Sequence, residues 1–178
     1  FKSKQTFPFR CPILFFISGI FPFFFLLVFL LATRSAYIIL ALPILVTAKG
    51  PVGTVGQPGN AVQELIQKEN PSLLIMIDAA LRLEGEKTGE VAEGVGAAIG
   101  GIGVDKFKIE EAATNNNIPV YAIIVKQTIV EAISVMTKEI AESVDSVHDI
   151  IHRIIDERTK PNDKVIIVGV GNTIGVIQ

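Results

Sequence analysis

Hydrophobic and polar positions follow different patterns in the two parts of the chain. Residues 13–31 contain no charged residue, and about 20 apolar residues are what a helix needs to cross the hydrocarbon core of a bilayer. Beyond residue 48, short apolar runs alternate with amphipathic stretches. The first pattern predicts a hydrophobic N-terminal helix. The second predicts a domain in which strands and helices alternate.

Three apolar runs have the length of a strand and contain no charge: Leu73–Ile77, Val120–Val125 and Val165–Val170. Uninterrupted apolar strands are typical of parallel sheets that are covered on both faces. Residues 60–69 and about 129–158 repeat their apolar positions at helical spacing, and we expect a break in the second helix near Ser143. The predicted fold class is therefore α/β, with three layers and a mostly parallel sheet.

The boundary between the two parts is expected near residue 47. The apolar run Ala36–Val46 is too short to span a bilayer and contains Pro43, so a buried strand at Tyr37–Leu42 or at Ile44–Thr47 is the alternative. We therefore divide the chain into a hydrophobic N-terminal segment, residues 1–47, and an α/β domain, residues 48–178. A single-pass membrane anchor is favoured for the first part, with a cleaved signal peptide or a mistranslated segment as alternatives.

Charge is distributed unevenly between these parts. Residues 1–47 carry four basic groups and no acid, whereas residues 48–178 carry 12 basic and 18 acidic groups, a net charge of −6. An acidic domain argues against binding to nucleic acid, which needs clustered Lys and Arg. The single Cys11 excludes an intrachain disulfide. The side of the membrane stays open, with the cytoplasm slightly favoured, and a homo-oligomer is an open alternative.

Asp78 is the strongest candidate for chemistry, because it follows directly on an apolar strand. Ligands of parallel sheets gather outside the carboxyl ends of the strands, and a carboxylate there can hold a divalent metal ion or acquire a raised pKa. The alternative is that Asp78 only caps the next turn. Residues 84–103 are rich in glycine and predict an irregular flap over the strand ends. Glu84 or Glu86 of this flap would then pair with Asp78.

Two further motifs are weak. His148 and His152 are four residues apart on a predicted helix, as in zinc proteases, but Asp149 replaces the catalytic glutamate and no third ligand is visible, so a polar helix flank is favoured. Gly169 and Gly171 follow a strand, but the glycine spacing differs from that of a dinucleotide fingerprint.

A resemblance to known protein families rests on residues 53–60, 70–80 and 117–123 and on the terminal residues 165–173. Over about residues 45–178 the chain resembles an uncharacterised archaeal family of membrane-anchored proteins, whose members are longer, so the domain is expected to be a fragment. More distantly, it is similar to the spore germination protease and the hydrogenase maturation proteases.

This second resemblance implies an α/β fold and site residues. Asp78 would match one of two cleavage acids, and Gly56 and Gln57 would belong to a glycine-rich block before a helix. Gly169, Gly171 and Asn172 would match a strand end that carries the other acid, but no carboxylate follows here. The resulting hypothesis is a membrane-anchored scaffold or sensor that binds a ligand or metal ion, and the alternative is an aspartate-dependent peptidase.

Overall fold

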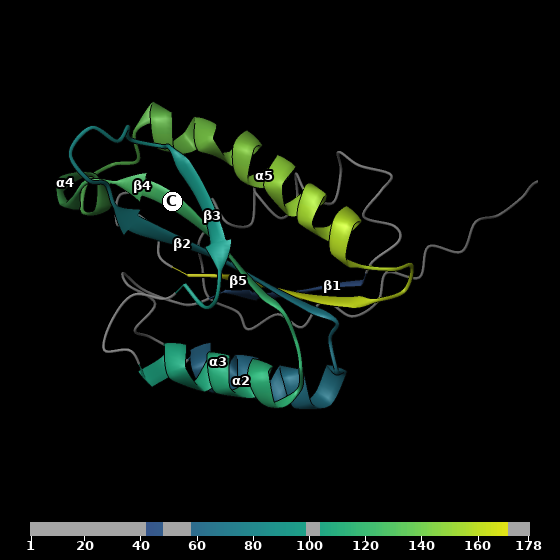
Figure 1. Ribbon diagram of the computed structural model, residues 1–178. Coiled ribbons are helices and arrows are strands. Elements are labelled where there is room, and N and C mark those ends of the chain that lie inside the picture. Colours follow the sequence, from purple (N-terminus) through teal and green to yellow (C-terminus); the bar gives the residue numbers. More distant parts are fainter. Residues whose placement is uncertain (1–41, 48–57, 99–103, 171–178) are drawn as a thin grey trace, which may run out of the picture.

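The computed structural model describes residues 42–47, 58–98 and 104–170 (Figure 1). The strands are β1 Leu42–Thr47, β2 Leu73–Leu81, β3 Val91–Val95, β4 Val120–Gln127 and β5 Lys164–Gly169. The helices are α2 Pro58–Glu69, α3 Val104–Asn115, α4 Ile129–Ala132 and α5 Lys138–Arg158. Strands and helices alternate through most of this part of the chain, as the hydrophobic pattern predicts.

The strands form one sheet in the order β1-β5-β2-β4-β3. β1, β5, β2 and β4 are parallel to one another, and β3 pairs with the outer side of β4 in the antiparallel direction. Helices α2 and α3 lie on one face of the sheet and α5 lies on the other (Figure 1). The prediction of an α/β fold with a mostly parallel sheet is confirmed.

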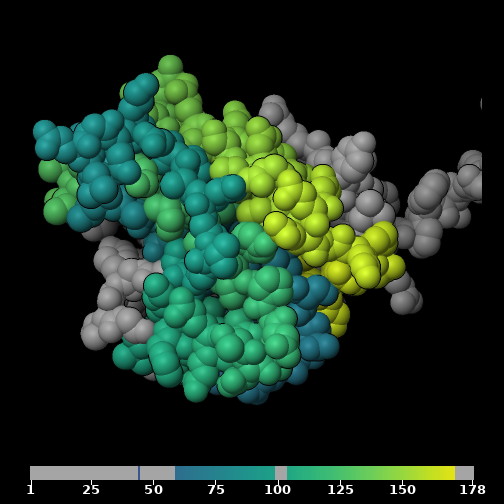
Figure 2. Space-filling model, in the orientation of Figure 1, coloured from purple at the N-terminus to yellow at the C-terminus, as the bar shows by residue number. Residues whose placement is uncertain are grey.

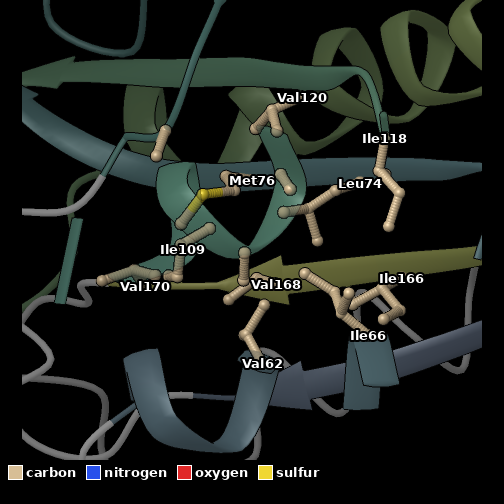
Figure 3. Packing of buried hydrophobic residues seen from close by; sticks show 13 residues of the cluster. Val62, Ile66, Leu74, Met76, Ile109, Ile118, Val120, Ile166, Val168 and Val170 are labelled. Atoms are coloured by element: carbon tan, nitrogen blue, oxygen red, sulfur yellow. The ribbon is translucent and has the colours of Figure 1, made fainter. Parts of the chain in front are cut away.

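Strand β2 is the centre of the core because its residues alternate between the two faces. Leu74 and Met76 belong to a buried cluster with Val62 and Ile66 of α2 and Ile109 of α3 (Figure 3). Residues 73, 75 and 77 of β2 pack with residues of α5 on the opposite face. Both faces of β2 are therefore buried in apolar side chains, and this explains why its sequence shows no polar alternation.

The predicted long helix is divided at a different place from the one expected. α4 ends at Ala132 and α5 begins at Lys138, with Thr137 as the N-cap residue. The expected break near Ser143 is wrong, because Ser143 lies within α5 and its hydroxyl donates to the carbonyl oxygen of Ile140, at 2.7 Å. The helix continues through this position to Arg158, with the Ser143 side chain buried.

The glycine-rich region also differs from its prediction. An irregular segment was expected throughout residues 84–103, but Val91–Val95 form the edge strand β3. Neither space nor backbone requires glycine at Gly94 of this strand, because a Cβ atom added there would have no atom within 4 Å. Helix α3 follows and was not predicted, since its inward side consists of only Ile109, Ala112 and Ala113.

The N-terminal part is only partly described. Residues 42–47, grouped above with the hydrophobic segment, form β1 and pair with β5. No helix within the described ranges is long and apolar enough to span a bilayer. The predicted anchor, residues 13–31, lies outside those ranges.

The packing of α5 on the sheet can be tested with a single truncation. Ile151 is fully buried against β2, so Ile151→Ala should lower the free energy of unfolding by about 2–5 kcal/mol. Val130→Ala is the control, because this side chain is 68% exposed and should cost less than about 0.5 kcal/mol. Urea unfolding followed by circular dichroism measures both, and equal costs would contradict the described core.

Candidate ligand site at the carboxyl edge of the sheet

Asp78 lies within β2 and not after it, because β2 continues to Leu81. On one side, the strands end earlier than β2. β5 ends at Gly169, which is in register with Ile77, and β1 ends at Thr47, which is in register with Gly169. Asp78 is therefore the first residue of β2 beyond the last register pair with β5. The prediction that Asp78 follows the end of its own strand is wrong: Asp78 lies beyond the end of β5, but β2 and β4 continue to Leu81 and Gln127.

The side chain of Asp78 is on the same face as Leu74 and Met76, because residues two apart in a strand share a face. This is the face that α2 and α3 cover. Asp78 is only 8% exposed, and its Oδ1 accepts the backbone N–H of Ala79 at 2.7 Å. Burying a carboxylate here, where β5 ends and β2 continues, costs free energy unless hydrogen bonds or a cation compensate for the lost contacts with water.

The first turns of α2 and α3 begin at this same edge. Each helix leads at its C-terminus into the start of a parallel strand, so each runs antiparallel to the strands. The two first turns touch: the backbone N–H of Gly59 donates to Oδ1 of Asp105, at 3.2 Å. A Cβ atom at Gly59 would lie 2.5 Å from that oxygen, so glycine permits the close approach of the helices.

The first part of the predicted flap, with the residues before it (82–90), is hydrogen-bonded to β4 and α4. Arg82 and Gly89 donate backbone hydrogen bonds to carbonyl oxygens at the end of β4. The hydroxyl of Thr88 donates to Oε1 of Glu131 at 2.8 Å, and the backbone N–H of Thr128 holds the pKa of Glu131 below its usual value. Figure 2 shows this teal segment against the green residues of α4 and the start of α5. Residues 82–90 therefore have a defined position beside α4.

Glu86 makes the strongest contact of this segment. Its Oε1 is 2.5 Å from Nζ of Lys126, and its Oε2 accepts the backbone N–H of Leu83 at 2.6 Å. The hydrogen bond from Lys126 lowers the pKa of Glu86, with the Leu83 N–H as the next cause. Glu86 is therefore held in its ionised form. A carboxylate in this state is poorly suited to donate a proton to a leaving group.

Lys126 is a site residue that the sequence reasoning missed. In the register of β2 and β4, Asp78 is opposite Ile124 and Ala80 is opposite Lys126. Asp78 and Lys126 therefore share a face of the sheet, and Glu86 reaches that face through its ion pair. The available signal was that Lys126 is the first charged residue after an apolar strand, as Asp78 is.

The other predicted site residues have separate outcomes. Glu84 is exposed. Gly169 is the last residue of β5, and the next residue, Val170, donates its N–H to the carbonyl oxygen of Ile77 at 2.7 Å. The remaining four lie outside the described residues: Gly56, Gln57, Gly171 and Asn172. Within the described ranges, no three His, Cys, Asp or Glu side chains are grouped as a metal site.

A family model covers most of the chain. Residues 41–177 match the model described as Domain of unknown function (DUF1512) C-terminal. No curated protein and no solved structure matches the chain. The expected match to a family of unknown function over about residues 45–178 is confirmed. Archaeal origin, membrane anchoring and likeness to the germination protease stay predictions.

Three glycine substitutions test how residues 82–90 are held. Gly89 has a φ of +77°, and a Cβ atom there would overlap the carbonyl oxygen of Glu139. Gly89→Ala should therefore cost about 1–3 kcal/mol or more of stability. Gly85 has a φ of +92°, but a Cβ atom there would have no atom within 4 Å. For Gly85→Ala, only the backbone cost of about 1–2 kcal/mol therefore applies.

The matched control is Gly94→Ala, where φ is ordinary and the space is open. The free energy of unfolding of this variant should stay the same or rise by up to about 1 kcal/mol. Thermal or urea unfolding gives the ranking. A Gly89 variant as stable as the Gly94 variant would contradict the contact with α5.

The Glu86–Lys126 pair predicts a pH dependence. Because the pKa of Glu86 in the folded state is lower than its ordinary value of 4.5, the pair contributes stability that is complete above that value and is lost as pH falls through the lowered pKa. The difference in melting temperature between the wild type and Glu86→Gln should therefore shrink on acidification below about pH 4.5. Lys126→Met should reduce the difference to what the Leu83 N–H alone contributes, and an undiminished difference in this background would refute the pair.

Proposed function

The chain belongs to the DUF1512 family through its C-terminal domain, and from this premise we propose that the domain is a scaffold or sensor that binds a ligand or divalent metal ion, tethered to a membrane by residues 13–31. The observation that carries the proposal is Asp78: a carboxylate only 8% exposed, at the point where its neighbour β5 ends. Support for the tether comes from the length and the lack of charge of the N-terminal apolar stretch.

The chemistry of this edge favours a cation or a hydrogen-bond donor as the ligand. Asp78 can accept such a partner on the face covered by α2 and α3. Helix N-termini usually favour anions, but here the carboxylate of Asp105 already accepts the Gly59 N–H at the start of α2. A second anion at this place would meet the charge of Asp105. A divalent cation, by contrast, prefers carboxylate and carbonyl oxygens together with water.

An aspartate-dependent peptidase is the second candidate, and it rests on the resemblance of Asp78 to a cleavage acid. Hydrolysis by two carboxyl groups requires pKa values that lie apart, so that one group is protonated when the other is ionised. Glu86 is the flap acid that reaches the relevant face, but both of its carboxylate oxygens are already engaged, one by Lys126 and the other by the Leu83 N–H. This arrangement supports a structural role for Glu86, and the scaffold or sensor is therefore the preferred function.

Replacement of Asp78 tests the proposed site. Mg²⁺, Ca²⁺ and Mn²⁺, each added separately, should raise the melting temperature of the wild type, because a ligand at about 100 times its Kd adds about 2.7 kcal/mol of stability. Asp78→Asn should remove the shift while it keeps the size of the side chain. Asp145→Asn is the matched control, because Asp145 is an exposed residue of α5, and it should keep the full shift.

Peptide hydrolysis is measured on the same samples. An identical shift in wild type and Asp78→Asn would eliminate Asp78 as the binding group. Hydrolysis that depends on Asp78 would establish the peptidase instead of the scaffold. Circular dichroism of each variant verifies that the fold is retained.

A further inference from the structure

A pair of histidines lies on the other face of the sheet, on α5. His148 and His152 are one turn apart, with their Nε2 atoms at 3.0 Å and their ring centroids at 4.2 Å. Both side chains are half-buried. Two imidazoles one turn apart on a helix can present nitrogen atoms to the same point. This pair is distinct from the Asp78 edge, because α5 covers the face opposite α2 and α3.

The flank of α5 that carries the pair follows from helix geometry. Successive residues are rotated by about 100°, so His148 and His152 fall on one side of the buried stripe formed by Val147 and Ile151. Arg153 falls on the other side, where it forms an ion pair with Glu93 of β3. The histidines are therefore on the flank away from the β3 edge.

Acidic residues lie near the pair. Nδ1 of His148 is 3.9 Å from Oδ1 of Asp149, and Nε2 is the nitrogen that faces His152. In metal sites, a carboxylate near the non-coordinating nitrogen orients the ring in this way and makes the coordinating nitrogen more basic. Burial and the neighbouring His148 lower the pKa of His152, while Asp156 and Asp149 act in the opposite direction.

At 3.0 Å the two Nε2 atoms are at hydrogen-bond distance, so a metal ion bound by both nitrogens would take the place of the proton between them. A metal ion with bonds of about 2.1 Å to both nitrogens would subtend an angle of about 90° at this separation, whereas tetrahedral coordination needs about 3.4 Å between the nitrogens. Angles near 90° are typical of octahedral or square-planar ions, and imidazole suits Ni²⁺ and Cu²⁺. An ion of this class fits the present Nε2 separation, whereas tetrahedral Zn²⁺ requires the two rings to move apart by a few tenths of an ångström.

We infer that His148 and His152 form a two-histidine chelate for a divalent first-row transition metal of the Ni²⁺ and Cu²⁺ class. Since the described residues contain no group of three or more ligands, the pair supplies two positions and water or another molecule fills the rest. Such a site exchanges its metal readily. Metal binding joins successive turns of α5, and it stabilises the helix that packs on β2.

The test uses the full chain without a polyhistidine tag, titrated separately with Cu²⁺, Ni²⁺ and Zn²⁺. The wild type should bind one Cu²⁺, with nitrogen hyperfine splitting in its electron paramagnetic resonance spectrum. His148→Gln and His152→Gln should each weaken binding by at least about tenfold, since even changes outside the coordination shell produce losses of that size. Glu111→Gln is the control, because Glu111 is an exposed residue of α3 on the opposite face, and it should bind as the wild type does.

A compensating variant tests the spacing itself. His148→Gln/Asp156→His restores two histidines four residues apart, one turn later on α5, and should recover Cu²⁺ binding relative to His148→Gln alone. Circular dichroism verifies that α5 is intact in each variant. Unchanged binding in both single variants, or no spectral change in the wild type up to about 1 mM Cu²⁺, would overturn the chelate.

Discussion

The burial of β2 on both faces is the constraint on which the rest of the structure depends. Leu74 and Met76 require α2 and α3 on one side, while Leu73 and Ile75 require α5 on the other. Neither layer can be removed without exposing the central strand. A charged residue is tolerated in such a strand only where the apolar surroundings of the strand end. Asp78 lies at such a point, just beyond the end of the neighbouring strand β5. The position of the candidate ligand site thus follows from how the core is built.

The central strands could be predicted because burial on two faces leaves an unmistakable apolar run. The peripheral elements could not, for different physical reasons. β3 is an edge strand with Glu93 and Gly94 in its five residues, and such strands are weakly apolar because one side faces water. The inward side of α3 uses Ala112 and Ala113, and small residues give a helix little amphipathic contrast.

The candidate site could be predicted only in part. Asp78 was identifiable because a charge next to an apolar run is visible in the sequence. Its continuation within β2 was not visible, since pairing of residues 78–81 with β4 depends on the register of distant strands. The same reason hid Lys126: its contact with Glu86 joins residues forty positions apart. The i, i+4 spacing of His148 and His152 is visible in the sequence, but the short distance between their Nε2 atoms depends on side-chain rotamers.

The alternation that builds the core also separates the two groups of polar residues. Asp78 and Lys126 share the face of α2 and α3, and the histidines belong to α5 on the opposite face. Hard cations such as Mg²⁺ and Ca²⁺ prefer oxygen, whereas Ni²⁺ and Cu²⁺ prefer imidazole. Because β2 lies between the layers, a ligand on one face reaches the other through Ile75 and Met76 and their neighbours. Coupling between the faces, where it exists, must therefore act through the packing of β2.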